Sequence, residues 1–194
     1  GWSNNDANRT GTLEAKGATF TAEDTTKRWD GFNIYNGAGD NMFDSLTVLH
    51  ANRAFEIFSG EKNPTIKNST IRNAVHGVWV EDVNLNTRIH NNTFDKILSY
   101  PIRIRTIDLD STLYANTYTN LDSAQSYILV IPDMGWSYAS GRTYDWTKDN
   151  LPYRVNNNFR FYANSTNPSR LKVHDGVTVE IDNGKSIYIG HDNG

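Results

Sequence analysis

The fold is decided by two stretches of the chain, Ile66-Lys-Asn-Ser-Thr-Ile-Arg-Asn-Ala74 and Ile89-His-Asn-Asn-Thr-Phe-Asp-Lys-Ile97. Segments 43–51 and 113–121 follow the same pattern, so four units recur at spacings of 23, 23 and 24 residues. The recurring apolar residues are Phe43, Ile66, Ile89 and Leu113, and then Val48, Ile71, Phe94 and Tyr118. A repeat of this length predicts a solenoid in which each unit forms one turn.

A second strand accompanies each unit. These strands read Gly31-Phe-Asn-Ile34, Ala54-Phe-Glu-Ile57, Gly77-Val-Trp-Val80 and Pro101-Ile-Arg-Ile104, with apolar residues two apart. That alternation is typical of a half-buried strand. Together the strands predict an all-β, right-handed parallel β-helix of about six to eight coils. Leucine-rich repeats have a similar period, but their leucine frame is absent.

Equivalent residues of successive coils should stack about 4.8 Å apart, so columns in the alignment become ladders in space. Asn68 and Asn91 form one such column. Asparagine tolerates left-handed backbone angles, and its amide can bond to a neighbouring coil. We therefore expect these two residues to stack in a tight turn.

Composition restricts the possible functions. The 194 residues have a formal net charge of −3 and no cysteine, and the basic residues are scattered. We therefore expect no nucleic-acid partner, no disulfide and no thiolate metal site. No apolar run approaches the roughly 20 residues of a membrane span, and residues 1–5 do not resemble a signal peptide.

The C-terminal third carries the motifs Thr143-Tyr-Asp-Trp146 with Thr147, Pro152-Tyr-Arg-Val155 and Gly176-Val-Thr-Val179, and a final strand ending at Gly190. These motifs resemble parallel β-helix regions of large bacterial or archaeal secreted and surface proteins, which belong to the pectate-lyase-like superfold. The resemblance covers nearly the whole chain, so we expect a single β-helix domain over 1–194. Residues 132–150 break the repeat period and are predicted to be an aromatic-rich insertion. The resemblance assigns Trp146 to a structural motif and implies an extracellular or cell-surface location, but no activity.

The order of these motifs suggests how the chain is used. Joining Ile187-Tyr-Ile-Gly190 to Gly11-Thr-Leu-Glu-Ala15 would give the pattern of uninterrupted coils. Open solenoid ends expose strand edges and apolar core, which proteins cap or pair. We therefore expect a non-catalytic structural or adhesive module, with other copies or adjacent repeats as partners end to end. The alternative is an excised fragment whose ends are frayed.

Two groups of residues are candidates for binding an extracellular polysaccharide. The outward column Asn33, Glu56, Trp79 and Arg103 combines amide, carboxylate, indole and guanidinium groups. Such a set could bond and stack on a glycan, although it is also an ordinary solvated strand face. The insertion adds Trp136 and Tyr138. If exposed, these two aromatics would form a binding flap.

An enzyme is the less favoured alternative. A polysaccharide lyase or glycosidase needs positioned carboxylates and basic groups, and the available pieces are Glu81, Asp82, Asp108, Asp110, Arg103 and Arg105. No known catalytic motif of β-helix enzymes is complete, so no catalytic residue is assigned.

Three minor signals remain. The threonine column at 47, 70, 93 and 117 lacks the regular Thr-x-Thr face of ice-binding solenoids. The five histidines have no metal-ligand spacing; no cofactor is predicted, although turn Asp and Asn residues could hold calcium. Four glycosylation sequons occur; Asn8 and Asn164 are the candidates, because Asn68 and Asn91 could not be glycosylated if they faced inward.

Overall fold

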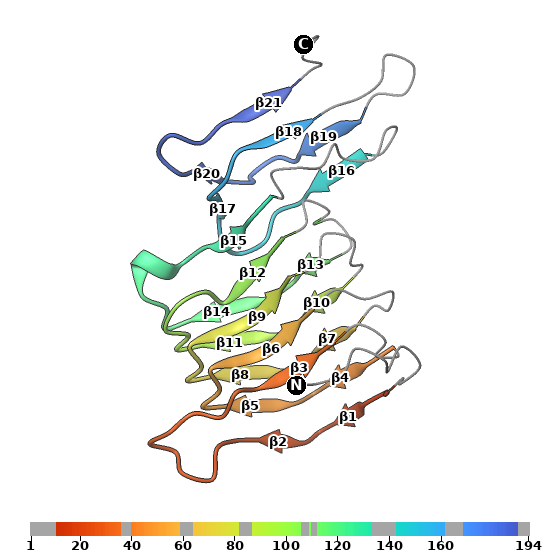
Figure 1. The fold of residues 1–194 in the computed structure, drawn as a ribbon, viewed down its shortest axis with the longest axis vertical. Coiled ribbons are helices and arrows are strands. Elements are labelled where there is room, and N and C mark those ends of the chain that lie inside the picture. The colour runs from red at the N-terminus through yellow and green to blue at the C-terminus, as the bar shows by residue number, and fades with distance from the viewer. Residues whose placement is uncertain are drawn as a thin grey trace, which may run out of the picture.

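The computed structural model describes residues 11–35, 40–58, 64–81, 87–105, 109, 112–132, 143–161 and 169–189. The described chain winds as a parallel β-solenoid, with strands stacked coil upon coil along the long axis (Figure 1). None of its segments is a helix long and apolar enough to cross a membrane.

Three parallel sheets form the sides of the solenoid. The first contains β1 (Glu14–Lys16), β4 (Met42–Asp44), β7 (Thr65–Lys67), β10 (Arg88–His90) and β13 (Leu113–Tyr114). The second contains β2 (Thr19–Phe20), β5 (Thr47–Leu49), β8 (Thr70–Arg72), β11 (Thr93–Asp95) and β14 (Thr117–Thr119). The third contains β3 (Phe32–Ile34), β6 (Arg53–Ile57), β9 (His76–Val80), β12 (Ile102–Ile104), β15 (Ile128–Val130), β17 (Tyr153–Val155) and β20 (Val179–Ile181).

The predicted register is confirmed. Ile66 pairs with Phe43 and with Ile89, and Ile89 pairs with Leu113. In the second sheet Val48, Ile71, Phe94 and Tyr118 are likewise in register. Each repeat is therefore one winding of the backbone, and the aligned apolar residues form one continuous core.

The number of regular coils differs from the expectation. The first two sheets have five strands each, so about five turns are regular rather than six to eight. A 3₁₀ turn at Ser123–Gln125 leads from β14 into β15. The strands β16 (Thr143–Trp146) with β19 (Arg170–Val173), and β18 (Phe159–Phe161) with β21 (Ile187–Ile189), form two separate pairs instead. The spacing of 23 or 24 residues ends here, and the first and second sheets end with it, whereas the third sheet continues through β17 and β20.

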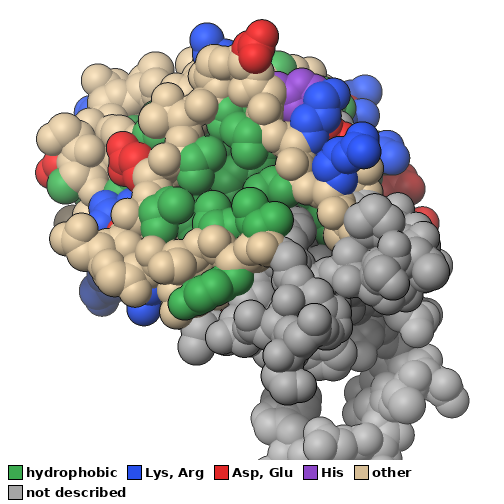
Figure 2. Space-filling model, turned by 90° about the horizontal axis from the view of Figure 1, so that it is seen from above, with side chains coloured by type: hydrophobic (Ala, Val, Ile, Leu, Met, Phe, Trp, Pro, Cys, Tyr) green, Lys and Arg blue, Asp and Glu red, His purple; other side chains and the backbone are tan. Residues whose placement is uncertain are grey.

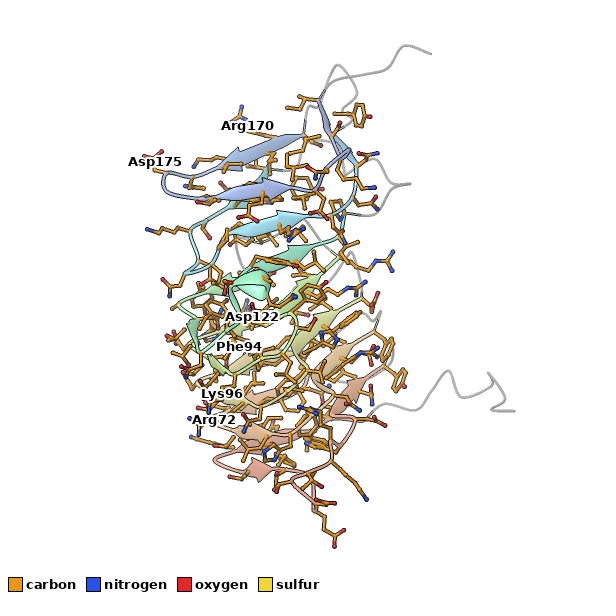
Figure 3. The ribbon with its side chains drawn as sticks, turned by 90° about the vertical axis from the view of Figure 1, so that its left-hand side faces the viewer. Arg72, Phe94, Lys96, Asp122, Arg170 and Asp175 are labelled. Carbon is orange, nitrogen blue, oxygen red and sulfur yellow. The ribbon has the colours of Figure 1, made fainter. Side chains whose placement is uncertain are left out.

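The corners of the regular coils are made by residues with left-handed backbone angles. Between the first and second sheets these are Gly17, Ser45, Asn68, Asn91 and Ala115, and between the second and third sheets they are His50, Asn73, Lys96 and Asn120. The eight that are not glycine have φ between 53° and 57°. Figure 3 shows one side of the stack, where Arg72, Lys96 and Asp122 follow one another from lower to higher coils.

Asn68 and Asn91 occupy equivalent corners as expected, but their side chains are exposed rather than inward. The Asn68 amide donates to Asp44 of the preceding coil at 2.8 Å. The buried polar ladder lies one residue further along, at Ser69, Asn92 and Asn116. Ser69 N–H donates to Asn92 Oδ1 at 3.0 Å, and Asn92 N–H donates to Asn116 Oδ1 at 3.1 Å.

A buried carboxylic acid stands at the top of this ladder. Asn116 Nδ2 lies 3.5 Å from Asp149 Oδ2, and the Tyr118 hydroxyl donates to the same oxygen at 3.0 Å. Burial raises the pKa of Asp149 above its ordinary value, although hydrogen bonds from Asn150 N–H, Tyr118 and Asn116 oppose this. The polar interior of the regular coils thus ends at one carboxyl group.

Candidate functional site

The outward face of the third sheet carries the predicted binding column. Asn33 pairs with Glu56, Glu56 with Trp79, and Trp79 with Arg103, so the four side chains do stack in one row. The row continues along the same sheet through Leu129, Arg154 and Glu180.

Trp79 lies between two guanidinium groups. Arg53 on β6 lies 4.6 Å from the ring centroid and Arg103 on β12 lies 4.0 Å from it, and these two strands flank β9 on opposite sides. Such contacts contribute roughly 0.5–2 kcal/mol each. Trp79 Nε1 and Arg103 Nη1 both donate to Glu81 Oε1. A sugar could stack on this indole only by displacing one of the two arginines.

A second aromatic row runs beside the first. The His76 imidazole meets Trp79 edge to face, stacks on Tyr100 at 5.7 Å, and Tyr100 is followed by Tyr127 at 5.7 Å. Arg154 lies over the Tyr127 ring at 4.8 Å. Burial, together with the positive charges of Arg53 and Arg103, lowers the pKa of His76 to about 4. His76 is therefore neutral at physiological pH.

A polar groove of about 500 Å³ opens at the lower end of the row, where it is lined by Asp30, Asn33, Asn52, Arg53, Glu56, Val75 and His76. Arg53 Nη1 donates to both Glu56 oxygens, at 2.6 and 2.7 Å, and Asn52 Nδ2 donates to Asp30 at 3.1 Å. His76 Nδ1 is buried without a hydrogen-bond partner. Glu56 is thus paired with a guanidinium and Asp30 accepts from a neutral amide, while Asn33 is exposed.

This chemistry suits uncharged hydroxyl groups better than acid–base work. Amides and a paired guanidinium–carboxylate set can exchange hydrogen bonds with a polyol. A glycosidase or lyase instead needs carboxylates free to move a proton or a basic group free to neutralise a uronate. In the groove, Glu56 and Arg53 satisfy each other.

The structure brings together only part of the predicted set. Of the catalytic pieces, Glu81 is bound by Arg103 and lies 3.5 Å from Arg105 Nη1. Asp82, Asp108 and Asp110 lie outside the described residues. So do the binding candidates Trp136 and Tyr138 and the glycosylation candidates Asn8 and Asn164. Among the residues that the structure does describe, no three His, Asp or Glu side chains gather as a metal site.

The insertion at 132–150 is described only from residue 143 onward and at 132. Trp146 is fully buried and packs against Tyr153, with ring centroids 5.6 Å apart. The predicted packing role of Trp146 is confirmed. The sequence did not point to Arg53 and His76 as groove residues. Each lies three positions before a residue of the row, Glu56 or Trp79, and an odd spacing does not fit the alternation of outward residues along a strand.

The two ends of the solenoid are a second candidate. At the C-terminal end, Trp146 is 0% exposed but its register partner Val173 is 47% exposed; Val155 is 0% exposed but its partner Ile181 is 43% exposed. In Figure 2, which looks down on this end, hydrophobic side chains gather in the middle of the face within a polar rim. Val173 and Ile181 are in register with inward-facing residues, and within the described residues no further coil lies over them.

The N-terminal end is similar. Phe20, Trp29 and Phe32 form an aromatic cluster with centroid distances of 4.8 and 5.3 Å to Phe32, and all three are only partly buried. Leu13 is 41% exposed. The strands at this end, β1, β2 and β3, are each an edge of their sheet.

No protein-family model, curated protein or solved structure matches the chain. The function is therefore argued from the groove, the outward row and the two open ends.

Proposed function

We propose that this chain is a non-catalytic structural and adhesive β-solenoid module of an extracellular or cell-surface assembly, in which coils continue head to tail from one unit to the next. The observation that carries the proposal is the exposure of inward-facing residues at both ends. Burying such side chains contributes roughly 1.5–3 kcal/mol each relative to leaving them in water.

Unpaired strand edges add to this drive. β20 and β3 are the two edges of one seven-stranded sheet, and each has a row of backbone groups on its outer side. Natural proteins usually cover or charge such edges, because they pair readily with another strand. Here the edges accompany exposed apolar side chains, which favours pairing.

Sedimentation velocity over a range of concentrations tests the proposal. We expect the sedimentation coefficient to rise with concentration, and the variant Ile181→Lys to suppress the rise because it places a charge on the apolar end. The matched control is Leu98→Lys, since Leu98 is 57% exposed and lies on the flank beside the corner residues Lys96 and Asn120. A wild-type chain that stays monomeric at high concentration would contradict the proposal.

A second candidate function is glycan binding, and the observation that favours it is the polar groove around Asn33 and Glu56. Because Arg53 is paired with Glu56 and Asp30 adds a further negative charge to the groove, we expect uncharged sugars rather than uronates. Glycan-array binding should fall in Asn33→Ala and Asn52→Ala but not in Arg72→Ala, which alters the second sheet. Release of an unsaturated product from uronate polymers would instead show a lyase and contradict the non-catalytic proposal.

A further inference from the structure

We propose that the partner of each end is a second copy of this chain, held in one register: β20 of one copy pairs with β3 of the next, and β19 pairs with β1. This inference rests on the proposed head-to-tail function and specifies its interface. The arguments are the sheet edges, the order of inward and outward residues, and the charges that the register brings together.

The third sheet sets the first part of the register. Along this sheet, inward residues lie against inward residues at every step, as Tyr153 and Val155 do against Val179 and Ile181. At the other edge, Phe32 and Ile34 face inward against Phe55 and Ile57. Continuing the sheet therefore places Val179 on Phe32 and Ile181 on Ile34, with Glu180 beside Asn33 on the outer face.

The position of β19 determines the second strand pair of the interface, that of β19 with β1. Asn150 Nδ2 donates to Asn116 O at 2.6 Å, and Asn116 lies at the corner between β13 and β14. The chain thus reaches this corner just after β16, so β16 lies on the side of the solenoid that the first sheet occupies below. β19 pairs with β16 on that side, and Figure 3 shows Arg170 and Asp175, at the two ends of this strand region, on the uppermost coils. The β1 strand of a following copy would lie on β19.

The side chains of these two strands match in kind. In β19, Leu171 and Val173 are in register with the buried Tyr144 and Trp146 and so face inward. In β1, Ala15 packs against the core, and Leu13 lies two residues before it on the same face. Pairing Leu171 with Leu13 and Val173 with Ala15 covers an apolar surface that is otherwise exposed.

The same register brings Lys172 beside Glu14 on the outer face. Both side chains are exposed and lie between the paired apolar residues of their strands. The molecule already uses such pairs between coils: Asp44 and Lys67 are in register and 3.5 Å apart, and Asp145 and Lys172 are in register and 3.7 Å apart. Glu14 would extend the Asp145–Lys172 pair by one coil. A shift by one residue along the strand would turn the apolar residues outward and lose this pair.

The first experiment exchanges the charges. In Glu14→Lys and in Lys172→Glu, each interface would oppose like charges, and we expect the apparent dissociation constant of end-to-end association to rise about threefold to tenfold. Mixing the two single variants, or combining both changes in one chain, restores opposite charges and should restore wild-type association. Additive weakening in the double variant would overturn the register.

The second experiment uses the absence of cysteine from the chain. In the variant carrying Glu180→Cys and Asn33→Cys, the two positions would be directly opposite across the interface, about 4.8 Å apart, within the range of a disulfide. We expect mild oxidation to give a ladder of covalent oligomers. The control pair Glu180→Cys and Tyr35→Cys is displaced by two residues, roughly 8 Å apart, and should cross-link poorly.

The outcomes separate the inference from the proposed function. Association of the wild-type chain with cross-linking in the control pair, or with no recovery on mixing the charge variants, would overturn the register and leave head-to-tail stacking intact. Absence of association in the wild-type chain would overturn both.

Discussion

The first five coils and the last two differ in the residues that turn the chain and in the sheets that their strands join. In the five regular coils, left-handed corners recur at residues such as Asn68 and Asn91, and a buried amide ladder follows the first corner. In the last two coils, glycines take the left-handed positions at Gly176 and Gly184, and no strand of the described part continues the second sheet.

The difference shows why the regular coils have the same shape. A buried polar residue is tolerated only if its hydrogen bonds are satisfied, and in the regular coils the neighbouring coil supplies them. Asn92 both accepts from Ser69 and donates to Ile66 O at 2.9 Å, so each coil depends on the next. The ladder ends at Asp149, so the coils above it are not bound to the same shape by these hydrogen bonds.

The largest expected effect comes from breaking the ladder. In Asn92→Ala, the buried Ser69 N–H would lose its partner and the Ile66 carbonyl would lose the bond from the Asn92 amide, and we expect a loss of roughly 2–4 kcal/mol in the free energy of unfolding, measured by urea denaturation. The matched control is the neighbouring Asn91→Ala, which should cost about 1 kcal/mol because Ala115 already occupies an equivalent corner. Equal losses would contradict the ladder's role.

A smaller loss should follow from adding one methyl group inside the regular coils. A Cβ at Gly77 would lie 2.2 Å from Pro101 O and 2.7 Å from Phe94 Cδ1, so we expect Gly77→Ala to cost about 2–3 kcal/mol. In the last coils, a Cβ at Gly184 would meet nothing within 4 Å, and only its φ of 73° opposes the change. Gly184→Ala should therefore cost about 1 kcal/mol. Thermal denaturation of both variants would check the contrast.

The boundary between the two regions should respond to pH. Burial raises the pKa of Asp149 in the folded chain above its value in the unfolded chain. Its contribution to stability is therefore full at pH values below the unfolded pKa and is lost as the pH rises through the folded pKa, where the buried group ionises. We expect Asp149→Asn to unfold at a higher urea concentration than the wild type at pH 7, by a margin smaller than the losses above. The margin should close as the pH falls below 3.8, the ordinary value. A margin independent of pH would contradict a buried, ionised Asp149.

The smallest effect is expected on the solvated flank. Arg72 pairs with Asp95 at 2.6 Å, but its side chain is half exposed, and Asp95 also accepts from Thr119 and Asn120. Arg72→Ala should cost less than about 1 kcal/mol, and the loss should shrink in high salt. A loss comparable to that of Asn92→Ala would show that surface pairs, rather than the interior ladder, hold the coils together.

The sequence predicted the regular coils well, because each apolar column is spaced by one winding. Phe43, Ile66 and Ile89 could be aligned by eye, and the outward row from Asn33 to Arg103 followed from the same register. The buried ladder could have been found too. A small polar residue precedes the aligned threonine at Ser69, Asn92 and Asn116, next to a corner that needs a left-handed angle.

Other features depend on contacts between residues whose spacing in the sequence follows no repeat, so the sequence pattern did not predict them. The stacking of Arg53 and Arg103 on Trp79 joins three coils, and Arg53 lies outside the aligned row. The change of shape after Val130 was missed because β16 and β19 keep strand character without the 23-residue spacing. The groove at Asn33 depends in the same way on residues of adjacent corners, such as Asn52 and Val75.

The one-coil register has a mechanical consequence. Since the strand pairs between regular coils join residues only 23 to 28 positions apart, a force applied to the two ends of the molecule would unfold the coils one at a time rather than all together. Each winding that peels away would release roughly 75 Å of extended chain. A tether built from such units would yield in even steps and absorb work over a long extension.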